Sequence, residues 1–290
     1  MKLREAISDA QTRLEEAGVP EAEFDARMVA AHVLGLRLSE LLMHRERMLT
    51  GDEQAALDTL VSARARREPL QYLLGCTGFH GREFLCDPRA LIPRPDTETL
   101  VDLALELARE HGLRVIADIG TGTGVIAITL AAELTGAEVL ATDVSPEALE
   151  LAAENVKQHK LGGRVTLLEG PWLEPLHESG WADRIEMVVS NPPYVREEDF
   201  DALMPEIVKH EPRHALVGSG EGGLGAYRAI IGQCAELPAL RAVAFEVGQG
   251  QAAAVADLLQ EKLNIAETII RRDLGKVDRV VAAVIGVLDR

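Results

Sequence analysis

Cysteine and aromatic residues are scarce in this chain, and their scarcity limits the chemistry that it can carry. Among the 290 residues there are three cysteines, and aromatic residues make up 3% of the sequence. Cys76, Cys86 and Cys234 form no Cys-x-x-Cys pair, so nothing favours a zinc ribbon or a dithiol redox site. An odd and sparse set of cysteines is typical of a reducing compartment, and we therefore predict a cytoplasmic location.

Long apolar runs and an excess of positive charge are also missing. The N-terminus is amphipathic and acidic rather than signal-like, and no stretch reaches membrane-spanning length, so no membrane association is expected. A formal net charge of −17 disfavours non-specific binding to nucleic acid. We interpret the small basic cluster Arg64–Arg67 as a solvated helix end. The eight histidines show no ligand spacing, and no metal site is predicted.

What the chain does contain is enough apolar sequence, 47% of its residues, to build a large core. Its patterning predicts three segments. Residues 1–75 favour three helices. The first carries Leu3, Ile7 and Leu14 and ends at Gly18-Val19-Pro20, the second covers 21–34 with Phe24 in its buried stripe, and the third runs to Arg67 with Asp52 as its cap. Residues 76–95 predict a hairpin that turns at Gly81 and then a proline-stiffened linker.

Residues 96–290 alternate strands with helices, which indicates an α/β fold with a mostly parallel sheet. We expect strands at 114–119, 138–142, 165–168, 185–190 and 242–247, each followed by a helix or a loop. Ile265–Arg271 and Arg279–Val287 then follow each other with no helix between them. Two such strands pair as a hairpin, so one of them must run antiparallel to its neighbours.

A glycine-rich loop follows the first of these strands and opens a helix. It carries Gly120, Thr121, Gly122, Thr123 and Gly124. Glycines there allow sharp turns and close approach to a ligand at the positive end of a helix. Asp143 ends the next strand, where a carboxylate suits a ribose.

Two cofactors fit this glycine loop. Gly122, Gly124 and Ala127 satisfy the looser dinucleotide pattern, whereas Asp118-x-Gly-x-Gly-x-Gly is closer to the loop of S-adenosylmethionine-dependent methyltransferases. Trp172 follows the third strand, where an aromatic ring can stack on adenine or pack in the core.

Asn191-Pro192-Pro193-Tyr194 ends an apolar strand and decides between these cofactors. In open α/β sheets the crevice beyond the carboxyl ends of the strands holds ligands. The prolines remove backbone donors, so carbonyls and the Asn191 side-chain oxygen can accept from an –NH₂ group, while Tyr194 offers a flat face. An amide or exocyclic amino nitrogen is a poor nucleophile, and acceptors that hold its hydrogens localise its lone pair and offset the growing positive charge. We therefore predict transfer of a methyl group from S-adenosylmethionine to such a nitrogen.

The chain resembles the HemK/PrmC family, the protein-glutamine methyltransferases of peptide chain release factors. The resemblance is nearly full length and is carried by Arg67–Gly75, Leu91–Glu98, Asp118–Gly124, Asp143, Ser190–Val195, Glu211-Pro212, Ala215-Leu216, Glu246–Gly248, Gln251 and Asp273–Gly275. The segment Ile-Pro-Arg-Pro-Asp-Thr-Glu is more specific than Asn-Pro-Pro-Tyr, which adenine and cytosine amino-methyltransferases share.

This resemblance implies a class I methyltransferase domain behind a small helical domain that recognises the substrate. It implies that Gly120–Gly124, Asp143, Trp172 and Asn191 contact S-adenosylmethionine, and that Asn191–Tyr194 receive the glutamine of a release factor's Gly-Gly-Gln motif. It further implies that Arg94, Asp96, Thr97 and Glu98 line or cover the cofactor end of the cleft.

The chain departs from the family pattern at Pro171, where an acid is common, and this puts one adenine contact in doubt. It departs again at Gly222, where an acid is also usual. The alternative functions are nucleic-acid adenine-N6 methylation, which needs a basic groove, and a non-catalytic module that only binds the cofactor.

Overall fold

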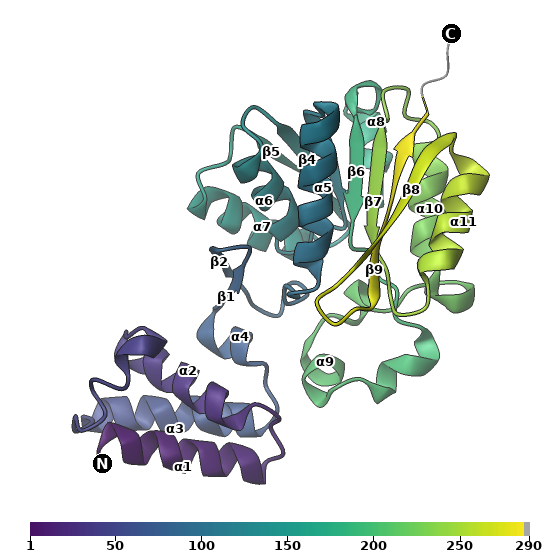
Figure 1. Ribbon diagram of the computed structural model, residues 1–290. Coiled ribbons are helices and arrows are strands. Elements are labelled where there is room, and N and C mark those ends of the chain that lie inside the picture. Colours follow the sequence, from purple (N-terminus) through teal and green to yellow (C-terminus); the bar gives the residue numbers. More distant parts are fainter. Residues whose placement is uncertain (287–290) are drawn as a thin grey trace. The chain divides into compact units, whose positions relative to one another are not determined.

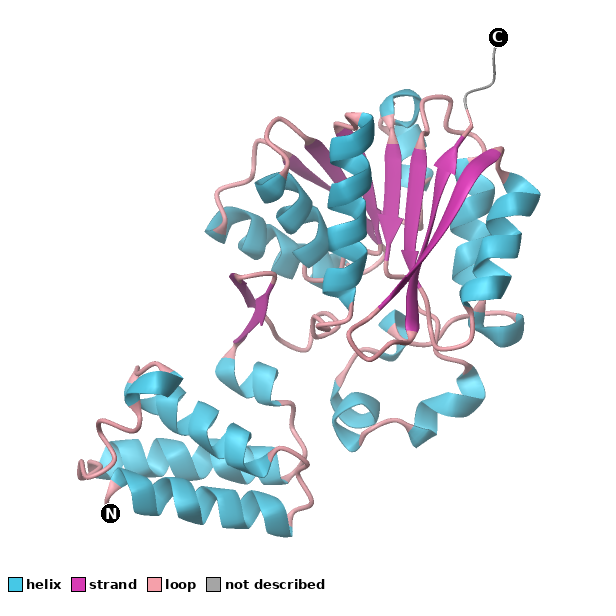
Figure 2. Ribbon diagram, in the orientation of Figure 1, coloured by secondary structure: helices cyan, strands magenta, loops and turns pink. Residues whose placement is uncertain are grey.

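The computed structural model describes residues 1–286, which divide into two compact units. The helical unit comprises Met1–Cys76 together with Leu203–Glu211, and the sheet unit comprises Thr77–Ala202 with the chain from Pro212 onward. Figures 1 and 2 show the elements of each unit. The predicted end of the last strand at Val287 lies outside the described residues.

The helical unit is built on three main helices whose apolar faces meet in one core. Its helices are α1 (Leu3–Glu16), α2 (Ala22–Leu34), η1 (Leu38–Glu40), α3 (Gly51–Ala65), α4 (Leu70–Leu74) and α9 (Pro205–His210). Two predictions here are wrong. Thr50 caps α3 by accepting from the Glu53 N–H at 3.2 Å, two residues earlier than the predicted Asp52. Phe24 is 46% exposed, because Ala26, Val29 and Ala30 form the buried face of α2.

The basic cluster at the end of α3 is also not what its sequence predicts, because only Arg66 is exposed. Arg64 is 6% exposed, and its guanidinium reaches Asp25 at 2.7 Å and Glu206 at 2.9 Å. Arg67 binds Glu206 through two nitrogens, each at 2.7 Å. The ion pairs therefore join α9, which lies far along the sequence, to α3 of the same unit.

The sheet unit has a seven-stranded sheet in the order β5-β4-β3-β6-β7-β9-β8. Its strands are β3 (Val115–Ile119), β4 (Glu138–Asp143), β5 (Val165–Glu169), β6 (Met187–Ser190), β7 (Ala242–Glu246), β8 (Ile265–Arg272) and β9 (Asp278–Ile285), preceded by the hairpin β1 (Cys76–Phe79) and β2 (Arg82–Leu85). The pairs among β3 to β7 are parallel, whereas β9 is antiparallel to both β7 and β8. The predicted α/β class and the antiparallel ending are both confirmed.

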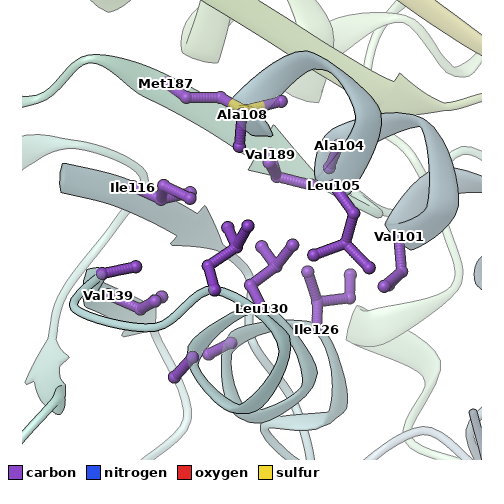
Figure 3. Packing of buried hydrophobic residues seen from close by; sticks show 14 of the residues in the cluster. Val101, Ala104, Leu105, Ala108, Ile116, Ile126, Leu130, Val139, Met187 and Val189 are labelled. Carbon is purple, nitrogen blue, oxygen red and sulfur yellow. The ribbon is translucent and has the colours of Figure 1, made fainter. Parts of the chain in front are cut away.

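Helices cover both faces of this sheet. Because successive side chains of a strand point to opposite faces, the core is divided into two clusters, one on each face. The helices are α5 (Thr97–His111), α6 (Val125–Glu133), α7 (Pro146–Gln158), α8 (Glu174–Glu178), α10 (Gly225–Cys234) and α11 (Ala252–Lys262). In β7, Ala242 and Ala244 belong to the cluster with α5 and α6, while Val243 and Phe245 belong to the cluster with α10 and α11. Figure 3 shows the first of these clusters, with side chains of α5 and α6 directed at β3 and β6. Because both faces of the sheet are buried, its central strands consist mostly of apolar residues, and polar residues lie at the strand ends.

Candidate functional site

The carboxyl ends of four neighbouring parallel strands bring the predicted site residues together. Ile119 pairs with Thr142 of β4 and with Ser190 of β6, and Ser190 pairs with Phe245 of β7. The next residue on each strand is therefore at one edge of the sheet. These residues are Gly120, Asp143 and Asn191, which were predicted for the site, and Glu246, which was not.

The glycine loop folds back over the end of β4. The N–H groups of Gly120 and Thr121 both donate to the Thr142 carbonyl at 2.9 Å. Gly122 has a φ of 55°, and a Cβ added to it would meet nothing within 4 Å, so its backbone faces open space. Gly124 is different, because a Cβ there would lie 3.3 Å from that of Ala152. It allows close packing of α6 against α7, whereas Gly122 leaves room for a ligand.

Asp118 fixes the conformation of the glycine loop through hydrogen bonds that its buried side chain accepts. Its side chain is fully buried, and Oδ2 accepts from the Thr121 hydroxyl at 2.6 Å and from the Ala127 N–H at 3.0 Å. Among the described residues, Oδ1 has no hydrogen-bond partner. Burial raises the pKa of Asp118 to about 7, although both of these hydrogen bonds act in the opposite direction.

Asp143 connects the glycine loop to the next helix. Its Oδ2 accepts from the Gly122 N–H at 2.8 Å, and its Oδ1 accepts from the Ser145 N–H at 3.0 Å. Ser145 in turn caps α7, because its hydroxyl accepts from the Ala148 N–H at 3.1 Å. Each carboxylate oxygen keeps further lone pairs for a ligand.

A pocket of about 300 Å³ lies at this edge of the sheet, within the sheet unit. Five predicted cofactor residues line it: Gly120, Gly122, Asp143, Trp172 and Asn191. Pro193 lines it as well, whereas Pro192 and Tyr194 do not, so the glycine loop and part of the Asn-Pro-Pro-Tyr turn share one cavity. Thr121, Thr123 and Gly124 lie behind this wall; both threonines are buried, and Gly124 precedes α6.

Other lining residues were not predicted for the site. They are Arg89, Ala90, Leu91, Thr142, Val144, Ala148, Gly170, Pro171, Pro212, His214, Ala215, Val217, Ser219 and Ala226. Leu91, Pro212 and Ala215 stand in the quoted family segments, which was the only sequence signal for them. Arg94, Asp96, Thr97 and Glu98 do not line this pocket; Asp96 pairs with Arg279 at 3.2 Å, and Glu98 accepts from the His80 N–H.

The Asn-Pro-Pro-Tyr turn is fixed on several sides. The Asn191 side-chain nitrogen donates to the Thr97 hydroxyl at 3.2 Å, and the Tyr194 hydroxyl donates to Glu246 at 3.1 Å. The Gln251 side chain donates to the Tyr194 carbonyl at 3.1 Å. Within the described residues, no N–H or O–H donates to the Pro192 or Pro193 carbonyl. The turn therefore keeps acceptors at its prolines.

Glycines pack closely behind the same turn. A Cβ added to Gly218 would lie 2.7 Å from the Pro193 carbonyl oxygen and 3.0 Å from the Tyr194 Cα. Its N–H donates to the Val195 carbonyl at 2.9 Å. The stretch from Gly218 to Gly225, which had no predicted role, therefore supports the back of the turn.

Residues 1–286 contain neither a metal site nor a membrane-spanning helix. No three His, Cys, Asp or Glu side chains there gather closely enough to hold a metal ion. No helix there combines the length and the apolar character that a bilayer crossing requires.

Comparisons with known proteins agree with the two-part organisation. Residues 5–75 match the family described as PrmC N-terminal domain, and residues 97–231 match the methyltransferase small domain. Proteins named release factor glutamine methyltransferase are similar over nearly the whole chain. The one from Bacillus cereus is 38% identical over 98% of this chain and 99% of its own length, and that from Geobacter sulfurreducens is 39% identical over 98% and 97%.

Solved structures show the same fold at lower identity. The catalytic domain of human METTL16 bound to an RNA hairpin aligns with a TM-score of 0.56 and 20% identity, covering 81% of this chain and 82% of that one. The human METTL16 N-terminal domain in complex with SAH aligns with a TM-score of 0.53 and 19% identity, covering 88% and 93%. These likenesses identify the sheet unit as a class I methyltransferase fold.

Proposed function

The chain belongs to the release factor glutamine methyltransferase family, and from this premise we propose its reaction. It transfers a methyl group from S-adenosylmethionine to the side-chain amide nitrogen of the glutamine in the Gly-Gly-Gln motif of peptide chain release factors. This takes place in the cytoplasm, where those factors act. The observation that carries the proposal is the turn Asn191–Tyr194, of which Asn191 and Pro193 line the same pocket as the glycine loop.

The lining of the pocket fits S-adenosylmethionine. Gly120 and Gly122 let a ligand approach the backbone, Asp143 accepts from ribose hydroxyls, and Trp172 gives an aromatic wall for adenine. A volume of about 300 Å³ is within the range of small-ligand pockets. Pro171 has no N–H to donate, so it adds only apolar contact.

The turn supplies what a weakly nucleophilic amide requires. The Asn191 side-chain oxygen and the Pro192 carbonyl accept the two N–H groups of the glutamine amide, and the Tyr194 ring lies against its plane. When bound, S-adenosylmethionine supplies an electrophilic methyl group on its sulfonium sulfur. As the amide nitrogen bonds to this methyl, the bond from sulfur to the methyl breaks and S-adenosylhomocysteine is the leaving group. The acceptors stabilise the positive charge that grows on this nitrogen, and its proton leaves to water afterwards.

The helical unit is the substrate-recognition part in this proposal. It exposes the apolar side chains of Leu42 and Met43, which are 72% and 75% exposed, next to Arg45. Adjacent exposed apolar side chains can form part of a surface that binds another protein. Replacing both by serine in the full chain should raise the KM for the release factor and leave the affinity for S-adenosylmethionine unchanged.

Mass spectrometry of a release factor incubated with the enzyme and S-adenosylmethionine tests the reaction directly. We expect one added methyl group on the Gly-Gly-Gln peptide. Asn191→Ala should fold normally and lose about 100-fold to 1000-fold in kcat, as expected when a preorganised polar group is removed from a reacting centre. Duplex DNA offered in the same tube tests adenine methylation, which the net charge of −17 disfavours. Label on DNA and none on the release factor would overturn the proposal.

A further inference from the structure

A buried carboxylate lies behind the Asn-Pro-Pro-Tyr turn, and the reaction proposed above gives it no role. Glu246 ends β7 and is 1% exposed. Within the described residues, no Lys or Arg forms an ion pair with it. Its two oxygens instead accept from hydroxyl groups, Oε2 from Thr97 at 2.6 Å and Oε1 from Tyr194 at 3.1 Å. Burying a carboxylate on neutral donors alone is costly, so its place in the sheet calls for a functional reason.

The hydrogen bonds run in a fixed direction from Asn191 to this carboxylate. A hydroxyl has one hydrogen to donate and lone pairs with which to accept. The Thr97 hydroxyl donates its hydrogen to Glu246, so towards Asn191 it can only accept. Asn191 must therefore turn its NH₂ group to Thr97 and its oxygen Oδ1 the other way.

The orientation of the Asn191 amide decides whether it can serve the reaction. With Oδ1 directed away from Thr97, an acceptor is available to a ligand amide, and no N–H or O–H of the described residues competes for it. With the amide rotated by half a turn, the same position would present NH₂ and repel the N–H groups of a glutamine side chain. Only the first orientation holds the reacting nitrogen.

We propose that Thr97 and Glu246 are positioning residues that set the orientation of the Asn191 side-chain amide. The inference rests on the proposed function, since it explains how Asn191 meets a glutamine amide. Glu246 accepts the hydrogen of the Thr97 hydroxyl, and this hydroxyl then accepts from the Asn191 side-chain nitrogen. The same carboxylate also accepts from the Tyr194 hydroxyl. Both ends of the turn are thereby tied to one group at the end of β7.

Thr97→Val and Thr97→Ser separate this role from simple packing, because valine keeps the shape and serine keeps the hydroxyl. In the full-length enzyme we expect Thr97→Val to lower kcat for the release factor by about tenfold to a hundredfold, as expected for a misplaced reacting group. The KM for S-adenosylmethionine should stay within about twofold, and Thr97→Ser should recover most of the rate. Wild-type kcat in Thr97→Val would overturn the inference.

Thr129→Val is the matched control for losing a buried threonine hydroxyl. Thr129 is fully buried in α6, and its hydroxyl has no partner among the described residues. We expect this variant to keep its kcat and to melt no lower than the wild type. If it lost as much activity as Thr97→Val, the effect would belong to core packing, and the inference would fail.

Nuclear magnetic resonance measures the orientation without any turnover. The side-chain NH₂ signal of Asn191 is assigned by its absence from Asn191→Asp. We expect Thr97→Val to shift this signal and Thr97→Ser to leave it nearly in place; an unmoved signal in Thr97→Val would overturn the inference. If these shifts appear but the wild type methylates no release factor, the proposed function fails while the orientation of Asn191 by Thr97 stands.

Discussion

The two units bury carboxylates in opposite ways. In the helical unit, burial pushes the pKa of Glu206 upward, but hydrogen bonds from Arg67 and Arg64 outweigh burial and lower it. In the sheet unit, burial raises the pKa of Asp118 and of Glu246, and it outweighs the hydrogen bonds that both acids accept and the nearby charge of Arg279 that acts on Glu246. A carboxylate with a cation stabilises the packing of its unit, whereas one with neutral donors orients the groups that give it hydrogens.

Asp25 shows that an ion pair alone does not lower the pKa of a buried acid. It pairs with Arg64 at 2.7 Å, yet burial is the larger influence and raises the pKa of Asp25. Arg64 is shared between Asp25 and Glu206, so one cation serves two acids. The second cation, Arg67, binds Glu206 through two nitrogens and accounts for its lowered pKa. The contrast between the units is therefore set by the number of cations for each acid.

The strongest test of the contrast is Asp118→Asn in the sheet unit. The pKa of Asp118 is about 7 in the folded protein and 3.8 in a model peptide, so between these pH values the folded state holds a proton that the unfolded state has lost. Its contribution to the free energy of unfolding is complete below pH 3.8 and is lost as pH rises through about 7, by about 4 kcal/mol in all. In urea unfolding from pH 5 to pH 8, the free energy of unfolding of Asp118→Asn should increase relative to that of the wild type as pH rises.

Asp257→Asn serves as the control for this measurement, because Asp257 is exposed on α11. Its unfolding curves should run parallel to those of the wild type at every pH. Curves for Asp118→Asn that also run parallel to the wild type would mean that Asp118 is ionised in the folded state, and the contrast between the units would be lost.

Glu206→Ala tests the other side of the contrast. Removing this acid leaves Arg67 without a carboxylate and Arg64 with Asp25 alone. Breaking a buried pair costs about 3–5 kcal/mol, and we expect about 3 kcal/mol here because Asp25 still neutralises Arg64. Hydrogen exchange should locate the loss in α1 to α3 and in α9, with the sheet unit unchanged. Glu198→Ala, which removes an exposed acid with no ion pair in the described chain, should exchange like the wild type.

The sequence could predict the features that depend on local patterns, but not those that depend on contacts between distant residues. The glycine loop, Asp143 and Asn191–Tyr194 each follow an apolar strand, and the parallel arrangement then brings strand ends together whatever the loops do. The partner of Arg64 could not be predicted, because Glu206 is more than a hundred residues away and no local pattern joins them. Thr97 and Glu246 stood in recognisable segments, but their shared hydrogen bond is a tertiary contact, so sequence gave no role to Glu246.

Asp143→Ala should have a moderate effect that is confined to ligand binding. Asp143 is only partly buried, and its bonds to Gly122 and Ser145 are to backbone N–H groups, so the fold should survive. Losing a charged acceptor for the ribose should weaken S-adenosylmethionine binding by about tenfold to a hundredfold, with a smaller change in kcat. Calorimetric titration measures this, and an unchanged dissociation constant would contradict the ribose contact.

The smallest effect is expected where an ion pair is exposed, at Arg37 in the helical unit. Its side chain is 81% exposed and lies 2.9 Å from Glu40, and the hydrogen bond from Arg37 lowers the pKa of Glu40 to about 2. Solvent and salt screen such a pair, and the entropy of holding a long side chain offsets the attraction. Arg37→Ala should therefore leave the unfolding midpoint unchanged at neutral pH and physiological salt. A clear loss of stability would show that cations stabilise this unit at its surface as well as in its interior, and that burial is not what distinguishes Arg64.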